Sequence, residues 1–279
     1  MRTRERRVGV LVAALAGFLV AAAFATTVAG GKGPATASGV AVPASEPMDL
    51  VWISDSVGWG VARFYAQRIR EDLGVAVRVR DKWEGDLTAV AVLQRLRTPG
   101  HPWIRLIRNA EVVFVSGNAA GSAIVKGGNC VTTGCQRPKA VGPRPFRPYV
   151  AILKAIHKRI FEIRRGKPVI MRSANWYVPV ISHAPNNPFY QHVSWDGCGI
   201  TAVCTRQFEC LASAIAKAAA AYGVPVADVY TAFNGSGHRE DPVDKGYIDT
   251  DGIHVNDAGR AVFAETLAAL GYEQVTPPG

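Results

Sequence analysis

The chain has 279 residues, of which 48% are hydrophobic, so it can bury one substantial core and a single domain is expected. Its formal net charge is +10, from 32 Lys+Arg and 22 Asp+Glu, but the arginines are spread along the chain. Nucleic-acid binding would call for clustered basic residues with aromatic residues between them. The spread favours a solvated basic face and argues against a nucleic-acid partner; attraction to an acidic cell wall, glycan or lipid surface is the functional alternative.

The first 31 residues have the layout of an export signal. Four arginines (Arg2, Arg4, Arg6 and Arg7) precede an uncharged, mostly apolar run over residues 8–31. The run is longer than a usual signal-peptide core and long enough to span a bilayer. A cleaved signal peptide and a retained signal anchor therefore both stay open. We expect a secreted protein, or one anchored at the outer face of the cytoplasmic membrane.

Composition divides the rest of the chain into three parts. Residues 32–47 are rich in small residues and are interpreted as a flexible linker, 48–272 as the folded domain, and 273–279 as a C-terminal tail. Without the leader's four arginines and one glutamate, 28 Lys+Arg remain against 21 Asp+Glu, which is moderately basic. We expect this domain to be a monomer.

Strands and helices alternate along the domain. Short apolar runs predict strands at 50–53, 75–79, 111–115, 167–171 and 224–229. Helical periodicity predicts helices at 61–73, 87–97, 149–165, 206–222 and 256–270, with a short amphipathic piece at 103–108. A long aromatic loop is expected from Asn175 to Cys204. Strands separated by helices predict a parallel sheet covered by helices on both faces.

The first strand runs into the stretch Ser54-Asp-Ser-Val-Gly-Trp-Gly60. A serine at the carboxyl end of the first strand of an α/β sheet lies where such folds place their chemistry. A tight turn would lift Ser56 out of the sheet and point the surrounding peptide N–H groups at the atom it attacks. Ser56 could instead merely cap the following helix. A serine nucleophile also needs a base, and Asp251-Gly-Ile-His254 supplies one near the far end of the chain.

Other polar or glycine residues follow the remaining strands. Gly85 comes after the second predicted strand and Asn118 after the third. Because parallel strands end at one edge of the sheet, these residues are expected to lie near Ser56, Asp251 and His254. Acyl transfer needs a nucleophile, a base, a group that orients the base, and donors for the oxyanion, and each role has a candidate.

The order of Ser56, Gly85, Asn118 and Asp-x-x-His resembles the SGNH/GDSL hydrolases, a family of esterases and lipases. The resemblance covers about residues 48–272, and its most specific part is Asp251-Gly-Ile-His-Val-Asn-Asp-Ala-Gly-Arg260. It implies an α/β fold, a three-layer α/β/α sandwich with a five-stranded parallel sheet, of flavodoxin-like type. It also implies the roles of the residues. Ser56 would be the nucleophile, His254 the general base and Asp251 its orienter, and the oxyanion hole would consist of the Ser56 N–H, the Gly85 N–H and the Asn118 amide.

Two departures from the family pattern stand out. Ser54 and Val57 occupy places where the family's first motif has glycine and leucine. The third block reads Ser116-Gly-Asn-Ala119, without the family's first glycine and final aspartate. The missing glycines could restrict access to the oxyanion, and the missing aspartate removes a contact that orders the loop. These changes bear on rate and substrate more than on fold.

The sequence therefore predicts a secreted serine esterase that forms an acyl-enzyme on a lipid or carbohydrate ester, with an acetyl or longer acyl group, and needs no cofactor. Two alternatives stay open. One is an O-acyltransferase on the same fold, with a sugar hydroxyl in place of water. The other is a non-catalytic cell-surface module that binds glycan through the aromatic residues of the long loop. Those residues are Trp176, Tyr177, Phe189, Tyr190 and Trp195.

The five cysteines suit an exported protein better than a metal site. They are Cys130, Cys135, Cys198, Cys204 and Cys210. Export permits disulfides, and Cys130 and Cys135 flank a natural small loop, but one of the other three should be left unpaired and the sequence does not say which. Neither group contains the Cys-x-x-Cys pair of a zinc site, and the aspartates over 241–251 lack the spacing of a calcium loop, so no metal is expected.

Overall fold

Five parallel strands form one sheet in the computed structural model, which describes residues 46–116, 146–179, 181 and 201–276. The strands are β1 (Met48–Ile53), β2 (Val77–Asp81), β3 (Val112–Val115), β4 (Ile170–Ala174) and β5 (Val226–Ala227). Their order across the sheet is β2-β1-β3-β4-β5, and every pairing is parallel. Leu50 of β1 lies beside Val79 on one side and Val112 on the other. The first strand is therefore in the interior of the sheet.

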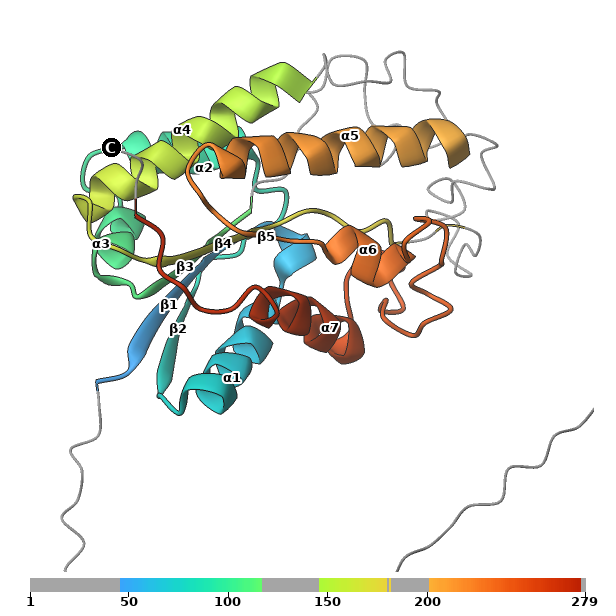
Figure 1. Cartoon of the computed structure of the whole chain (residues 1–279), viewed down its shortest axis with the longest axis horizontal. Coiled ribbons are helices and arrows are strands. Elements are labelled where there is room, and N and C mark those ends of the chain that lie inside the picture. The colour runs from blue at the N-terminus through green and yellow to red at the C-terminus, as the bar shows by residue number, and fades with distance from the viewer. Residues whose placement is uncertain (1–45, 117–145, 180, 182–200, 277–279) are drawn as a thin grey trace, which may run out of the picture. The chain divides into compact units, whose positions relative to one another are not determined.

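Helices cover both faces of this sheet (Figure 1). One face carries α2 (Ala89–Arg97), α3 (Pro102–Asn109), α4 (Arg147–Arg164) and α5 (Thr201–Ala220). The other carries α1 (Val61–Leu73), α6 (Val229–Asn234) and α7 (Asp257–Ala268). The predicted three-layer α/β/α sandwich with a five-stranded parallel sheet is confirmed.

Alternation along β1 divides the core into two halves. Val51 and Ile53 pack with the α2–α5 layer, whereas Leu50 and Trp52 pack with α1 and α7. All four are fully buried. Side chains that alternate between two apolar layers explain why the strand is a continuous hydrophobic run, as central parallel strands are. Trp52 stacks on Phe114 of β3 with ring centroids 3.7 Å apart, so the strand before Ser56 is firmly fixed.

Most element bounds differ from the predictions by a few residues. The second strand, predicted at 75–79, lies at Val77–Asp81, and the fifth, predicted at 224–229, spans Val226–Ala227. The fourth strand was predicted at 167–171 but lies at Ile170–Ala174, because it continues through Arg172. That side chain is fully buried, and its guanidinium donates to the carbonyls of Met171, Gly271 and Glu273. A charged residue is an unusual occupant of a central strand, and it is tolerated there because these carbonyls, two of them about a hundred residues away, accept its hydrogen bonds.

Helix α6 was not predicted, and α5 begins at Thr201, inside the predicted loop. Six residues are too few to show helical periodicity. The start of α6 is fixed by Asp228, whose carboxylate accepts from the Thr231 N–H at 3.1 Å.

At the other end of the domain, Val275 pairs with Val169 in an antiparallel bridge, so residues of the predicted tail contact the sheet.

The leader and most of the linker lie outside the described residues. Within the part of the chain that the structure describes, no helix has the length and apolar character needed to cross a bilayer.

Candidate active site

The carboxyl ends of β1, β2 and β3 lie together, as a parallel sheet requires, and hydrogen bonds join the segments that leave them. The Ser116 N–H, just after β3, donates to the Ile53 carbonyl at 2.9 Å. The Glu84 N–H, after β2, donates to the Ser54 carbonyl at 3.1 Å. The segments that carry Ser56 and Gly85 are therefore in contact at the edge of the sheet where α/β folds place their chemistry.

Ser56 begins a single 3₁₀ turn, η1 (Ser56–Gly58), and is partly exposed. Two residues earlier, Ser54 is fully buried, and its hydroxyl accepts from the Trp52 indole N–H at 2.9 Å. A Cβ on Gly58 would lie 2.6 Å from the Ser54 hydroxyl oxygen. Serine at position 54, in place of the family's glycine, is thus accommodated because glycine is present at 58. The turn stays tight and Ser56 remains accessible.

Asp55, beside the candidate nucleophile, is 1% exposed, and its Oδ2 has no hydrogen-bond partner. Burial raises the pKa of this carboxyl to about 7, against the opposing effect of backbone N–H groups in the turn. A buried group whose charged form is disfavoured makes stability depend on pH. Well below pH 4 the carboxyl is protonated in both folded and unfolded chains, and no penalty arises.

Asp55→Asn is therefore expected to stabilise the protein more in alkaline than in acidic solution. As pH rises from about 4 to about 7, the wild-type carboxyl ionises in the unfolded chain before it does in the folded chain. The free energy of unfolding therefore falls by at most roughly 4 kcal/mol. Asparagine never ionises and escapes this loss. Urea unfolding at about pH 5 and about pH 8.5 measures the difference. An equal pH dependence in the two proteins would show that Asp55 is not the group responsible.

The loop from Asp251 to His254 forms a hydrogen-bonded unit. One carboxylate oxygen of Asp251, Oδ1, accepts from the N–H groups of Ile253 and His254, both at 2.9 Å. The other, Oδ2, lies 2.5 Å from Nδ1 of the His254 imidazole. Burial acts to raise the pKa of Asp251, but the hydrogen bonds from Ile253 and His254 outweigh it and hold that pKa below its ordinary value. An ionised Asp251 can therefore orient the ring and favour a proton on Nδ1.

Contacts on both sides of the loop keep it in place. The Tyr177 hydroxyl donates to the Ile253 carbonyl at 2.9 Å. Ile248 and Val255 form an antiparallel bridge, and the Asp249 N–H donates to the His254 carbonyl at 2.8 Å. Asn256 then caps α7 by accepting from the Gly259 N–H at 3.0 Å. The imidazole is thus presented at the start of a helix whose position is fixed by the core.

Arg260 connects this loop to the turn of Ser56. From the first turns of α7, its Nε donates to the Trp59 carbonyl at 3.1 Å, and its guanidinium lies over the Trp59 ring, 5.0 Å from the centroid. The ring of Trp59 in turn meets the His254 imidazole edge-on, with centroids 6.4 Å apart. Gly60 completes the contact, because its φ is +74° and a Cβ there would meet the Arg260 side chain. Residues about 200 positions apart in sequence are therefore neighbours.

Three of the predicted residues, Ser56, Asp251 and His254, thus lie at one edge of the domain. In the described part of the chain the imidazole makes its hydrogen bond to Asp251, and none joins it to the Ser56 hydroxyl. Such bonds are often longer without substrate and tighten when it binds. The catalytic role of the three residues stays a prediction.

The two remaining candidates differ in what the structure says of them. Gly85 lies in an exposed turn between β2 and α2, with open space around the position of a Cβ. Asn118 lies outside the described residues, so its predicted place in the oxyanion hole is untested.

The structure describes the side chain of one cysteine, Cys210, which is buried in α5. Outside the described part lie Cys130, Cys135, Cys198 and the side chain of Cys204.

The proposed aromatic glycan surface is wrong for two of its residues. Trp176 and Tyr177 are 7% and 3% exposed and belong to the core. Trp176 packs with the α2–α5 layer, whereas Tyr177 packs on the other face of the sheet and donates to the Ile253 carbonyl. Phe189, Tyr190 and Trp195 lie outside the described residues. The sequence predicts no role for Trp59 or Arg260, because their contact joins segments about 200 residues apart and no local pattern marks it.

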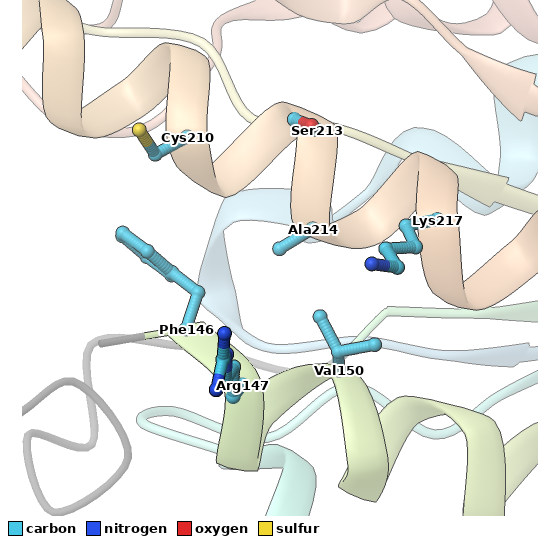
Figure 2. Close-up of a pocket in the computed structure, with 7 residues that line it drawn as sticks. All are labelled: Phe146, Arg147, Val150, Cys210, Ser213, Ala214 and Lys217. Atoms are coloured by element: carbon cyan, nitrogen blue, oxygen red, sulfur yellow. The ribbon is translucent and has the colours of Figure 1, made fainter. Parts of the chain in front are cut away.

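A hollow of about 240 Å³ lies away from these residues, between α4 and α5. Figure 2 shows Arg147 and Val150 of α4 opposite Ser213, Ala214 and Lys217 of α5. None of the predicted catalytic residues lines it. Among the described residues, no cluster of three or more His, Cys, Asp or Glu side chains could hold a metal ion.

No family model matches the chain, and no curated protein matches it in sequence. Several solved structures are similar to the chain in fold. The lipase Lip_vut3 from a goat rumen metagenome has a TM-score of 0.54 at 18% identity, covering 81% of this chain and 98% of its own. LAE5, an α/β hydrolase enzyme from the metagenome of Lake Arreo, Spain, has a TM-score of 0.51 at 16% identity, covering 80% and 94%.

A variant of Axe2, an acetyl xylan esterase from Geobacillus stearothermophilus, has a TM-score of 0.50 at 13% identity, covering 81% of this chain and 95% of its own. Together with the sheet order and the helices on both faces, these likenesses show that the chain has the fold of the SGNH/GDSL hydrolases.

Proposed function

We propose that the chain is a serine hydrolase that cleaves a carboxylic ester through an acyl-enzyme on Ser56. The observation that carries the proposal is the Asp251–His254 hydrogen bond, held beside the Ser56 turn by the contacts of Arg260 with Trp59. Its fold is also that of lipases and esterases. A nucleophile, a base and an orienter for the base, gathered at the carboxyl edge of the sheet, are what acyl transfer requires.

In this mechanism, the Ser56 hydroxyl attacks the ester carbonyl carbon while Nε2 of His254 takes its proton. Asp251 holds the Nδ1 proton and stabilises the imidazolium that forms. The tetrahedral oxyanion is met by the N–H groups of Ser56 and Gly85 and by the Asn118 amide. The imidazolium then gives its proton to the departing alcohol, which leaves an ester on Ser56. Water, deprotonated by His254, releases the carboxylic acid in the second half of the cycle.

The acceptor of the acyl group decides between hydrolase and transferase. If a sugar hydroxyl enters where water does, the same residues carry out O-acyl transfer. A non-catalytic glycan-binding module has less support, because two of its five proposed aromatic residues are buried.

The purified protein is expected to release p-nitrophenol from p-nitrophenyl acetate and from esters of longer acids, with an initial burst as the acyl-enzyme accumulates. The fall in rate with chain length gives the acyl preference. Addition of EDTA should leave the rate unchanged, since no metal takes part in the proposed steps. Mass spectrometry of mixtures that contain a sugar acceptor separates acid from acylated sugar. No release from any ester would contradict the proposal.

We also propose that the enzyme acts outside the cytoplasmic membrane, secreted or held there by residues 1–31. The four arginines followed by an apolar run support this proposal. The intact mass of the exported protein tells a cleaved leader from a retained anchor.

A further inference from the structure

Two tryptophans at the candidate active site are exposed. Trp59 is 42% exposed and Trp83 is 40% exposed, whereas Trp52, Trp103 and Trp176 are at most 7% exposed. Their rings lie 5.6 Å apart between centroids, at an interplanar angle of 44°. Of the exposed large hydrophobic side chains in the described part of the chain, the others are Leu73 and Val90. The packing of the domain does not account for two exposed neighbouring tryptophans, since the other tryptophans that the structure describes are buried. Such an exposed aromatic pair indicates a binding surface.

The pair belongs to the site rather than to a distant face. Trp59 follows the Ser56 turn and meets the His254 imidazole edge-on. Trp83 lies in the β2–α2 loop, two residues before Gly85. The two rings therefore link the segment of the candidate nucleophile with the segment of the candidate oxyanion glycine.

The ring of Trp59 and the backbone beside Trp83 are both held by neighbours, so the two segments are in place before a ligand arrives. Trp59 is fixed by Arg260, through its carbonyl and its ring. Next to Trp83, the Glu84 N–H donates to the Ser54 carbonyl, and its carboxylate accepts from both Nη atoms of Arg95, at 2.6 and 2.7 Å. Two rigid aromatic side chains lose little conformational freedom on binding, which favours affinity.

The surroundings of the pair indicate which ligand fits. A long acyl chain needs an enclosed apolar channel, but these rings are open to solvent and have charged side chains beside them. The Arg260 guanidinium lies over the Trp59 ring and pairs with Asp257 at 2.7 Å. Glu84, next to Trp83 in sequence, pairs with Arg95. A pyranose ring has an apolar face of C–H groups and a rim of hydroxyls. An aromatic surface with charged hydrogen-bonding groups at its rim complements both.

We propose that Trp59 and Trp83 form an aromatic platform that binds a sugar ring of a carbohydrate ester next to Ser56. The inference rests on the proposed function and names its substrate class. The ester to be cleaved is then carried on the sugar that stacks on the platform, and the acyl group lies toward the oxyanion hole. Trp83 acts in binding and orientation, and Trp59 does so while also contacting His254.

Binding to a protein that cannot turn over tests the platform apart from catalysis. The full chain with Ser56→Ala is titrated by calorimetry with β-1,4-linked tetrasaccharides of glucose, xylose and N-acetylglucosamine, and separately with dodecanoate. At least one tetrasaccharide is expected to bind, and adding Trp83→Ala should weaken it about ten-fold or more, with Trp83→Phe weakening it less. Leu73→Ala, an exposed hydrophobic residue at the end of α1, should leave affinity unchanged.

The outcomes separate the two proposals. Sugar binding that depends on Trp83, together with a wild-type protein that hydrolyses no ester, supports the platform and overturns the proposed hydrolase. Ester hydrolysis without binding of any tetrasaccharide, or with binding that ignores Trp83, overturns the platform alone. Dodecanoate binding that is lost with Trp83→Ala, with no sugar binding, would make the surface an acyl site and also overturn it. In the active protein, Trp83→Ala should reduce kcat/KM for an acetylated tetrasaccharide about ten-fold more than for p-nitrophenyl acetate.

Discussion

Ser56→Ala is expected to lower kcat for ester hydrolysis by about 10⁴-fold to 10⁶-fold and to leave the fold intact. The expectation follows from the proposed mechanism, in which the hydroxyl forms the covalent bond and no other group replaces it. The side chain is partly exposed at the start of a 3₁₀ turn, so its removal creates no buried cavity. Initial rates with p-nitrophenyl acetate and the circular dichroism spectrum measure the two parts of the prediction.

Ser54→Ala is the matched control for this loss. Ser54 lies in the same turn, and its hydroxyl accepts from Trp52 in the core. Its removal should cost about 1 kcal/mol of stability, because the indole N–H loses one acceptor but keeps the Gly58 carbonyl at 3.2 Å, and only a small part of the activity. A Ser56→Ala protein that kept more than about a hundredth of the wild-type rate would rule Ser56 out as nucleophile.

Asp251→Asn has the second largest expected effect, a fall in kcat of about 10⁴-fold. The geometry explains why so similar a residue should fail. Asp251 Oδ1 accepts from the N–H groups of Ile253 and His254, and the asparagine carbonyl oxygen can keep both bonds and hold the loop. Its NH₂ group then faces Nδ1 of His254. A donor there forces the proton onto Nε2, the atom that must accept the proton of Ser56.

Asp249→Asn provides the control, since Asp249 belongs to the same loop and its carboxylate accepts from the Thr250 N–H at 2.7 Å. That variant should retain nearly full activity, because the bond to the imidazole is untouched. A steady-state comparison of kcat and KM decides the matter, and the loss should appear in kcat. If Asp251→Asn kept more than about a tenth of the rate, Asp251 would be a loop-ordering residue, and another group would have to orient His254.

Much of the fold could be predicted from the sequence, because the signals are local. The helix Val61–Leu73 was predicted with its observed bounds, because its periodicity is clear and Gly74 ends it in the left-handed conformation common after the last helical residue. The fourth strand was displaced because Arg172 looks like a strand end. Its carbonyl partners near residues 271–273 could not be found from local pattern.

In the candidate site, too, local contacts could be predicted from the sequence and long-range contacts could not. The pairing of Asp251 with His254 is a contact over three residues, so sequence spacing could predict it. The contact of Arg260 with Trp59 spans about 200 residues and depends on how α7 packs on α1. Trp59 and Trp83 likewise become neighbours only because β1 and β2 are adjacent in the sheet. Gly85 and Asn118 keep their predicted oxyanion roles as predictions.

The reactivity of Ser56 is the central claim, and labelling tests it most directly. The purified protein is treated with a fluorophosphonate, which phosphonylates activated serines, then digested and analysed by tandem mass spectrometry. We expect one equivalent of label on the peptide that contains Ser56, loss of esterase activity in step with labelling, and no label on the His254→Ala protein. An active protein that takes up no label, or takes it up on another serine, would contradict the claim.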